Sequence, residues 1–322
     1  MIDVASEFEL HRRHLAGLAY RMLGSVAESE DVLQDAFLRW SAARSKANEA
    51  NEAGPPVETV DSPRAFLSRV VTRLCLDRLK SARARREQYV GTWLPEPLVS
   101  SGDEHDASAA GDGEPAMSSL AGEARGDQEA ALALAEDLSI ALLVTLETLS
   151  PLERAAFLLH DVFDMDFSEI AGVLERSEPA VRQLAARARS HVRDGRPRFS
   201  PSPAAGRLAE AFQGAVMRGE LPALARMLAE DAVFYSDGGG KRRAALNPIF
   251  GREKILRFFV GIARKRGALP EPGAMQAVMI NGMPGFLVHG DEGVETLALE
   301  IVGEQITAIY AVRNPDKLRH LS

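Results

Sequence analysis

The sequence predicts a multidomain protein in which two all-α domains precede a C-terminal α+β domain. Amphipathic helical patterns fill residues 5–90 and 135–195, whereas alternating or apolar runs between turn signals occur only in residues 204–322. Stretches rich in Ser, Gly, Pro and acidic residues separate the three parts. We therefore expect helical domains at 1–90 and 135–196, a flexible acidic linker at 91–134, and the α+β domain at 204–322.

The first helical domain is predicted to contain three helices. The first ends at Gly24, and Ser25 with Glu28 forms a capping-box pattern that starts the second. Two prolines in the polar stretch 46–61 indicate a loop. Ser62-Pro63 then opens a third helix, because proline is tolerated in a first helical turn. Its apolar face leaves Arg69, Arg73 and Lys80 on the other side.

The second helical domain ends in a helix-turn-helix pattern over residues 166–193. Ser150–Glu153 and Asp166–Glu169 are capping signatures that start two earlier helices, and residues 175–177 form the turn. In the last helix we expect base-edge contacts from exposed residues near its start and phosphate contacts farther along. The expected base-edge residues are Glu178, Arg182 and Gln183, and the phosphate residues are Arg187, Arg189 and Arg193. An ordinary helical hairpin with a solvated arginine face is the alternative interpretation.

The net charge of −8 does not exclude nucleic-acid binding, because the charges are unevenly distributed. Acidic side chains gather in residues 96–137, where Arg125 is the only Arg or Lys. Basic side chains gather in 62–89 and 182–198, within the two helical domains.

The sequence favours a cytoplasmic protein without a metal or other cofactor. Its longest apolar runs are far too short to span a bilayer, and charges occupy the place of a signal-peptide core. Cys75 is the only cysteine, so it has no internal disulfide partner, and no Cys/His cluster with metal-ligand spacing occurs.

The last domain is predicted to place helices at 204–229 and 251–266 beside a curved antiparallel sheet. Its expected strands are 277–280, 285–289, 295–301 and 305–313, with turns such as Asn281-Gly282 between them.

The order of motifs resembles the extracytoplasmic-function (ECF) sigma factors of the sigma-70 family. The segments Val26–Trp40 and Ser62–Glu87 resemble region 2 of that family, and Leu149–Ser190 resembles region 4. The resemblance implies a subunit that binds core RNA polymerase through its β′ clamp and β flap and directs initiation at promoters with −10 and −35 elements. A stand-alone DNA-binding regulator is the alternative.

Individual residues of the two regions take their expected roles from that resemblance. Asp31, Gln34 and Asp35 correspond to the surface that docks on the clamp, although a solvated acidic face is the plainer interpretation. Loop 46–62 corresponds to the segment that captures a flipped −10 base. The third helix corresponds to the −10 contact, with Arg69, Arg73 and Lys80 at phosphates, and region 4 corresponds to the −35 reader.

The last domain resembles the SnoaL-like cone, a fold related to nuclear transport factor 2. Three short motifs, at 93–97, 237–241 and 314–318, together resemble the group 41 ECF factors, in which a fused cone modulates activity. The resemblance implies regulatory roles for Trp93, Pro95, Asp237, Lys241, Asn314, Pro315, Asp316 and Lys317. We expect the last motif to reach Trp93, with a cap role for Asn314 as the alternative.

Other functions remain open for the cone. An enzyme of this fold needs a buried acid or base, for which Tyr235, Asp237 and His289 are the candidates. We expect Asp237 to be a turn residue and His289 to be structural, so catalysis is not expected. Ligand sensing in a cone pocket and anion binding by Gly238–Gly240 beside Lys241 are the other options.

Overall fold

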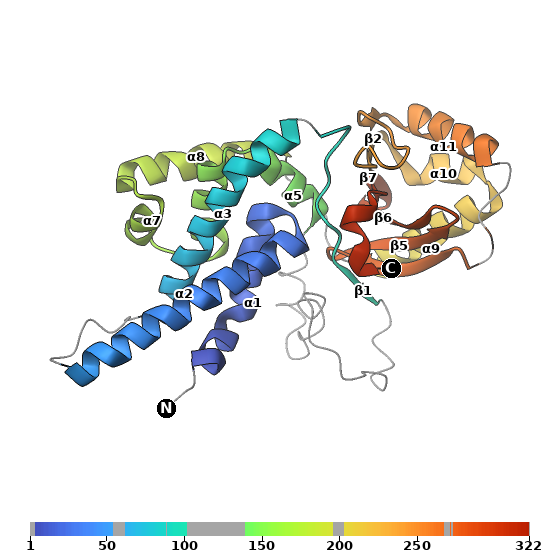
Figure 1. The fold of residues 1–322 in the computed structure, drawn as a ribbon. Coiled ribbons are helices and arrows are strands. Elements are labelled where there is room, and N and C mark those ends of the chain that lie inside the picture. Colours follow the sequence, from blue (N-terminus) through green and yellow to red (C-terminus); the bar gives the residue numbers. More distant parts are fainter. Residues whose placement is uncertain are drawn as a thin grey trace. The chain divides into compact units, whose positions relative to one another are not determined.

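A computed structural model describes residues 4–53, 62–87, 89–101, 139–195, 203–266, 271 and 273–321 (Figure 1). The chain divides into two compact units. Unit 1 comprises Met1–Glu87 and Thr145–Gly195, and unit 2 comprises Gln88–Val144 and Arg196–Ser322. None of the helices in these described ranges is long and apolar enough to cross a membrane.

The first part of unit 1 contains helices α1 (Val4–Leu23), α2 (Val26–Ala53) and α3 (Pro63–Glu87). Gly24, at a φ of 67°, ends α1, and the Ser25 and Ser62 hydroxyls accept hydrogen bonds from the first turns of α2 and α3. The C-terminal half of α1 is buried on all sides, and α2 and α3 each bury an apolar face, which includes Trp40 and Leu67, respectively. The predicted loop 46–61 was wrong over its first half, because α2 continues to Ala53. Its remaining residues lie outside the described ranges.

The second part of unit 1 contains α6 (Pro151–Phe157), the π-helix η2 (Leu158–Val162), α7 (Phe167–Leu174) and α8 (Glu178–Gly195). Ser150 and Glu153 form the predicted capping box at α6. Asp166 is the N-cap of α7, but its side chain makes no capping hydrogen bond, contrary to the predicted signature. The chain turns between α7 and α8 at Glu175, which is in the left-handed region.

Unit 2 is an α+β cone whose sheet has the strand order β1-β4-β5-β6-β7-β2-β3. The strands are β1 (Val99–Ser101), β2 (Leu228–Asp237), β3 (Ile249–Phe250), β4 (Met275–Ile280), β5 (Met283–Gly290), β6 (Gly293–Val302) and β7 (Gln305–Val312). Helices α9 (Pro203–Arg218), α10 (Leu221–Met227) and α11 (Arg252–Arg266) accompany them, with short 3-10 turns η3 (Pro315–Lys317) and η4 (Arg319–Leu321).

Two details of the predicted sheet needed correction. The strand β2 replaces the end of the helix that was expected to reach residue 229, since the apolar period changes within one continuous run. The sheet is also mixed, because β2 pairs in parallel with β7 while most neighbours are antiparallel. The turn at Asn281-Gly282 is as predicted, with a positive φ at both residues.

The predicted linker begins too early. Residues 89–101 belong to unit 2, where β1 pairs antiparallel with β4 from Val99–Ile280 to Ser101–Val278. Leu94, Pro95 and Pro97 are buried. A Ser- and acid-rich composition farther along masked this short ordered stretch. Residues 102–138 lie outside the described ranges.

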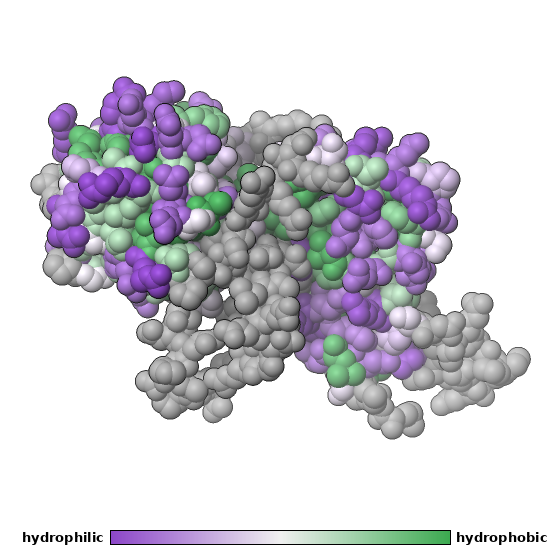
Figure 2. All heavy atoms as spheres, turned by 180° about the vertical axis from the view of Figure 1, so that it is seen from behind, coloured by the Kyte–Doolittle hydropathy of each residue, from purple (hydrophilic) through white to green (hydrophobic). Residues whose placement is uncertain are grey.

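Each face of the sheet carries its own apolar cluster. One cluster joins the sheet to α9, α10 and α11 around Phe212 and Phe286. The other cluster lies on the opposite face of the sheet and contains Tyr310 and Val312. These residues pack with Leu94, with Ile140 of helix α5 (Ile140–Glu147) and with Leu318 near the C-terminus. Segments far apart in the sequence therefore share the second cluster. The face of the molecule in Figure 2 is mainly polar where it is described, with small apolar patches.

Candidate functional site

The acidic face of α2 lies off the apolar stripe, as predicted. The side chains of Asp31 and Asp35 are 63% and 48% exposed, and Gln34 is also exposed. One residue that the sequence did not point to lies beside them. Arg78 of α3 donates to Asp31 at 3.1 Å and to Asp35 at 3.4 Å. The two carboxylates therefore share one cation while the chain is alone.

The three predicted phosphate residues of α3 lie in different surroundings. Arg69 is exposed and has no hydrogen-bond or ion-pair partner among the residues that the structure describes. Lys80 is exposed and pairs with Asp77 one turn earlier, at 2.8 Å. Arg73 instead reaches the helix-turn-helix of the same unit. It donates to the carbonyls of Gly172 and Val173 and pairs with Glu175.

The predicted base-edge residues of α8 begin the helix on an exposed face. Arg182 binds Glu178 through Nη2 at 2.6 Å, and its guanidinium lies over the ring of Phe167 at 4.4 Å. These two contacts hold the guanidinium in one orientation before any DNA arrives. Gln183 is exposed beside them.

The predicted phosphate residues of α8 are already paired within unit 1. Arg187 binds Glu153 at 2.8 Å and Arg189 binds Asp161 at 2.6 Å. Burial opposes ionisation of Glu153, but hydrogen bonds from Ser150 and Arg187 prevail and lower its pKa. DNA phosphates would have to replace these carboxylates. The side chain of Arg193 lies outside the described atoms.

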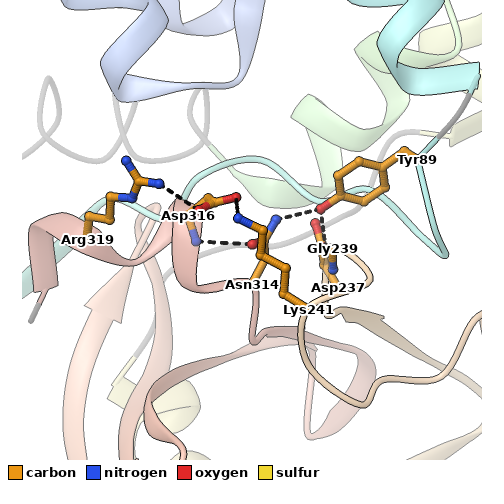
Figure 3. Close-up of polar contacts among 7 residues, drawn as sticks. All are labelled: Tyr89, Asp237, Gly239, Lys241, Asn314, Asp316 and Arg319. Carbon is orange, nitrogen blue, oxygen red and sulfur yellow. Dashed lines mark hydrogen bonds and ion pairs between the residues drawn. The ribbon is translucent and has the colours of Figure 1, made fainter.

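In unit 2, three distant segments meet at Asp237, the last residue of β2. Its side chain is fully buried and accepts from Tyr89 Oη at 2.5 Å, from the Leu94 amide at 2.8 Å, from the Gly239 amide at 3.0 Å and from Lys317 Nζ at 2.7 Å. Figure 3 shows Tyr89 pointing toward both Asp237 and Asn314. Four donors to one buried carboxylate join residues 89–94 to the C-terminal motif.

Asn314 has the cap role that was weighed for it and makes a second contact that the sequence did not indicate. Its side-chain oxygen accepts from the Asp316 amide and caps η3, in which Pro315 is the first residue. Its amide nitrogen donates to Tyr89 Oη at 2.9 Å. Burial, then the bond to Asp237, raises the pKa of Tyr89 well above its usual range, so the phenol stays protonated and donates. We call Tyr89, Asp237, Asn314 and Lys317 the Asp237 latch.

The glycine run makes room for this contact. A side chain at Gly239 would place a Cβ 2.2 Å from the Asn314 amide nitrogen, and the φ of +60° already favours glycine. The predicted anion site is used internally, since the Gly239 amide binds Asp237 itself. Lys241, the cation of the motif, pairs with Asp316 across the loop.

The C-terminal motif contacts Trp93, as expected. Lys317 Nζ lies 4.2 Å from the centre of the Trp93 ring and 5.1 Å from that of Tyr89, and it also donates to the Leu94 carbonyl. A cation over two aromatic faces adds to the ion pair with Asp237. Pro95 is buried next to this contact.

The candidates for catalysis do not come together. Asp237 is engaged by four donors, His289 is exposed on β5, and Tyr235 stacks on Tyr310 with ring centres 5.2 Å apart. The sequence missed a buried acid, Glu300 of β6, which accepts from Tyr310 Oη at 2.7 Å. Burial raises the pKa of Glu300. Its place on an alternating strand gave no signal beyond an inward-facing position.

Comparisons with known proteins agree with this arrangement. The model of Sigma-70 region 2 matches residues 8–85, and that of Sigma-70 region 4 matches residues 139–192. The ECF RNA polymerase sigma factor SigJ of Mycobacterium tuberculosis is 36% identical over 97% of this chain and 92% of its own length. The chain belongs to the ECF RNA polymerase sigma factors.

One further relative and a solved structure show the same likeness over almost the whole length of this ECF sigma factor. A probable ECF sigma factor SigI of Mycobacterium tuberculosis is 30% identical over 98% of this chain and 94% of its own. The crystal structure of Mycobacterium tuberculosis SigJ superposes with a TM-score of 0.72 at 33% identity and covers 98% of both chains. The two helical regions and the fused cone are therefore common to both proteins.

Proposed function

We propose that this ECF sigma factor directs promoter-specific initiation through two surfaces of unit 1 and is regulated by its cone through the Asp237 latch. The acidic face of α2 binds the β′ clamp of core polymerase, and region 4 binds the β flap. Helix α3 contacts the −10 element and α8 reads the −35 element. The observation that carries the regulatory part is the burial of Asp237 under the first residues after region 2.

The latch supports regulation because of where it falls in the chain. Region 2 ends with α3 at Glu87, and Tyr89 is already bound to Asp237 and Asn314. We call the segment that joins region 2 to region 4 the connector. At its other end, Ile140 and Ala141 belong to the apolar cluster of the cone. Both ends of the connector between the two promoter-binding regions are therefore anchored on the cone. The distance between the two promoter-binding regions can change freely only if one end of the connector is released from the cone.

The energetics suit a regulated contact. Breaking a buried ion pair such as Asp237–Lys317 costs about 3–5 kcal/mol, because the remaining charge stays buried. Burying Leu94 and neighbouring apolar residues adds to this stabilisation. Such a latch stays closed in the free chain, yet binding to polymerase is strong enough to open it.

We propose that the chain acts by binding and has no catalytic site, since the buried carboxylate of Asp237 is committed to four structural hydrogen bonds. We also propose no cofactor and a cytoplasmic location, where its partners are polymerase and promoter DNA. A small-molecule ligand of the cone would act by changing the latch.

Run-off transcription with core polymerase tests this proposal. The full-length chain is compared with one ending at residue 202, which lacks the cone, and one ending at Arg313, which lacks Asn314 and Lys317. We expect promoter-specific transcripts from all three and the same direction of change in both shortened chains. Absence of core-dependent transcripts would refute the sigma role, and equal activities of three folded chains would refute regulation by the cone.

A further inference from the structure

The turn of the helix-turn-helix lies against the helix that carries the predicted −10 contacts. Within unit 1, Arg73 of α3 places Nη2 at 3.2 Å from the Gly172 carbonyl and Nε at 3.3 Å from the Val173 carbonyl. Nη2 also lies 2.9 Å from Glu175 Oε1. One guanidinium is thus surrounded by three oxygen atoms from the end of α7 and the residue that follows it.

These oxygens offer Arg73 what a DNA phosphate offers. The last carbonyls of a helix lack intrahelical donors and carry the negative end of the helix dipole, equivalent to roughly half a charge. The Glu175 carboxylate adds a full negative charge beside them. An arginine that binds phosphate through its planar fork is satisfied by the same arrangement.

A second arginine makes the converse contact between the two regions. Arg154 of α6 is buried, and its Nη1 donates to the Met22 carbonyl in the last turn of α1 at 2.7 Å and to Glu147 at 2.6 Å. Each region therefore contributes an arginine to a helix C-terminus of the other. Arg154 is enclosed, whereas the side chain of Arg73 is 43% exposed, so the Arg73 contact is the one that solvent and DNA can reach.

We propose that the α7–α8 turn is an internal substitute for promoter phosphate: it occupies Arg73 in the free chain, and DNA competes for the same guanidinium. This inference rests on the proposed role of Arg73 as a phosphate contact. The contact lies entirely within unit 1, and the connector anchors on the cone limit how far region 4 can move when the contact opens. Region 4 must leave α3 before Arg73 can bind the −10 element.

The backbone at Glu175 supports a function for its side chain. Glu175 has a φ of 54°, in the left-handed region that glycine adopts without strain. Glycine is the usual residue in this left-handed position at a helix C-terminus, so a glutamate here carries a backbone cost that glycine would avoid. The strained residue here supplies the only carboxylate that the described atoms place on Arg73.

The test uses two substitutions of Glu175 in the full-length chain. Glu175→Gln keeps the size and removes the charge, and Glu175→Gly removes the carboxylate while relieving the backbone, so loss of folding does not obscure the result. Arg69→Ala is the matched control, because Arg69 lies one turn from Arg73, has the same proposed role and makes no described contact with region 4.

Two measurements are made on each variant. Spin labels at Ser6→Cys on α1 and Ser190→Cys on α8 report the separation of the regions, since both positions are exposed and the native Cys75 is fully buried. Binding of a fluorescent random-sequence DNA duplex at low salt reports phosphate contact. An ion pair whose side chains are 43% and 75% exposed predicts that both Glu175 variants bind DNA roughly two- to fivefold more tightly and widen the distance distribution.

The controls separate the outcomes. We expect Arg69→Ala to weaken DNA binding without changing the distances, and Arg73→Ala to widen the distances without a gain in binding. Wild-type distances in both Glu175 variants would overturn the proposal. Wider distances without tighter DNA binding would overturn the competition and the phosphate role of Arg73, while core-dependent transcription would still test the sigma role separately.

Discussion

Replacing Tyr89 with phenylalanine removes one hydroxyl group from the Asp237 latch. That hydroxyl donates to Asp237 at 2.5 Å and accepts from Asn314 at 2.9 Å. A hydrogen bond to a charged group contributes about 1.5–3 kcal/mol, and Asn314 additionally loses its acceptor. Since each 1.4 kcal/mol is a factor of ten, release of the connector should become roughly 10- to 100-fold more frequent.

Hydrogen exchange measures this release directly. The Leu94 amide binds Asp237, and the Leu98 amide binds the Asn281 side chain, so both exchange only when the connector leaves the cone. We expect peptides covering residues 89–98 to exchange about 10- to 100-fold faster in Tyr89→Phe, with unchanged exchange in β6 and β7.

Tyr235→Phe is the matched control, because it removes a phenol oxygen from the same cone outside the latch. It should leave exchange of the connector as in the wild type. If Tyr89→Phe exchanged like the wild type, the hydroxyl would not hold the connector. Faster exchange throughout the cone would show a general loss of stability instead of a latch.

Three further predictions concern other parts of the molecule. Arg182→Ala should reduce discrimination among −35 sequences by about 1–3 kcal/mol in holoenzyme binding assays, whereas equal weakening for every sequence would exclude a base contact. Asp31→Arg combined with Asp35→Arg should weaken binding in a core-polymerase pull-down while lowering the melting temperature only slightly, because the exposed ion pairs with Arg78 contribute little stability, and unchanged affinity would contradict the clamp assignment. Glu300→Gln should stabilise the cone at neutral pH, because the raised pKa of Glu300 means that stability present below the unfolded pKa of about 4.3 is lost as pH rises through the folded value. Thermal unfolding at pH 5 and pH 8 checks this, and an equal pH dependence in both proteins would contradict it.

The sequence contained enough information for the domain order and for most of the helical domains. Capping residues such as Ser62 and Ser150 act locally, so their patterns identify helix starts before any tertiary contact is known. The order of the motifs in the two helical regions also indicated the family. The strands β4 to β7 were predicted within a few residues, because alternation and turn residues are also local signals.

Long-range contacts account for what the sequence did not reveal. Tyr89 follows a basic helix, and nothing near it indicates a partner at Asp237. Residues 99–101 form a strand only because β4 offers an edge to them. Arg73 was predicted to face DNA but binds region 4, and Arg78, which the sequence did not single out, binds the acidic face of α2. The spacing of residues along a helix shows which face a side chain is on, but it does not show which residue of another helix that side chain binds.

Transcription by the Tyr89→Phe chain with core polymerase tests the central claim most directly, because the substitution removes a single oxygen atom from the latch through which we propose that the cone regulates promoter recognition. Run-off assays would compare the wild type, Tyr89→Phe, Tyr235→Phe and the chain ending at residue 202. We expect core-dependent, promoter-specific transcripts from all four, with Tyr89→Phe shifted in the direction of the shortened chain and Tyr235→Phe equal to the wild type. Activity of Tyr89→Phe equal to the wild type, beside a changed activity of the shortened chain, would contradict regulation through the latch.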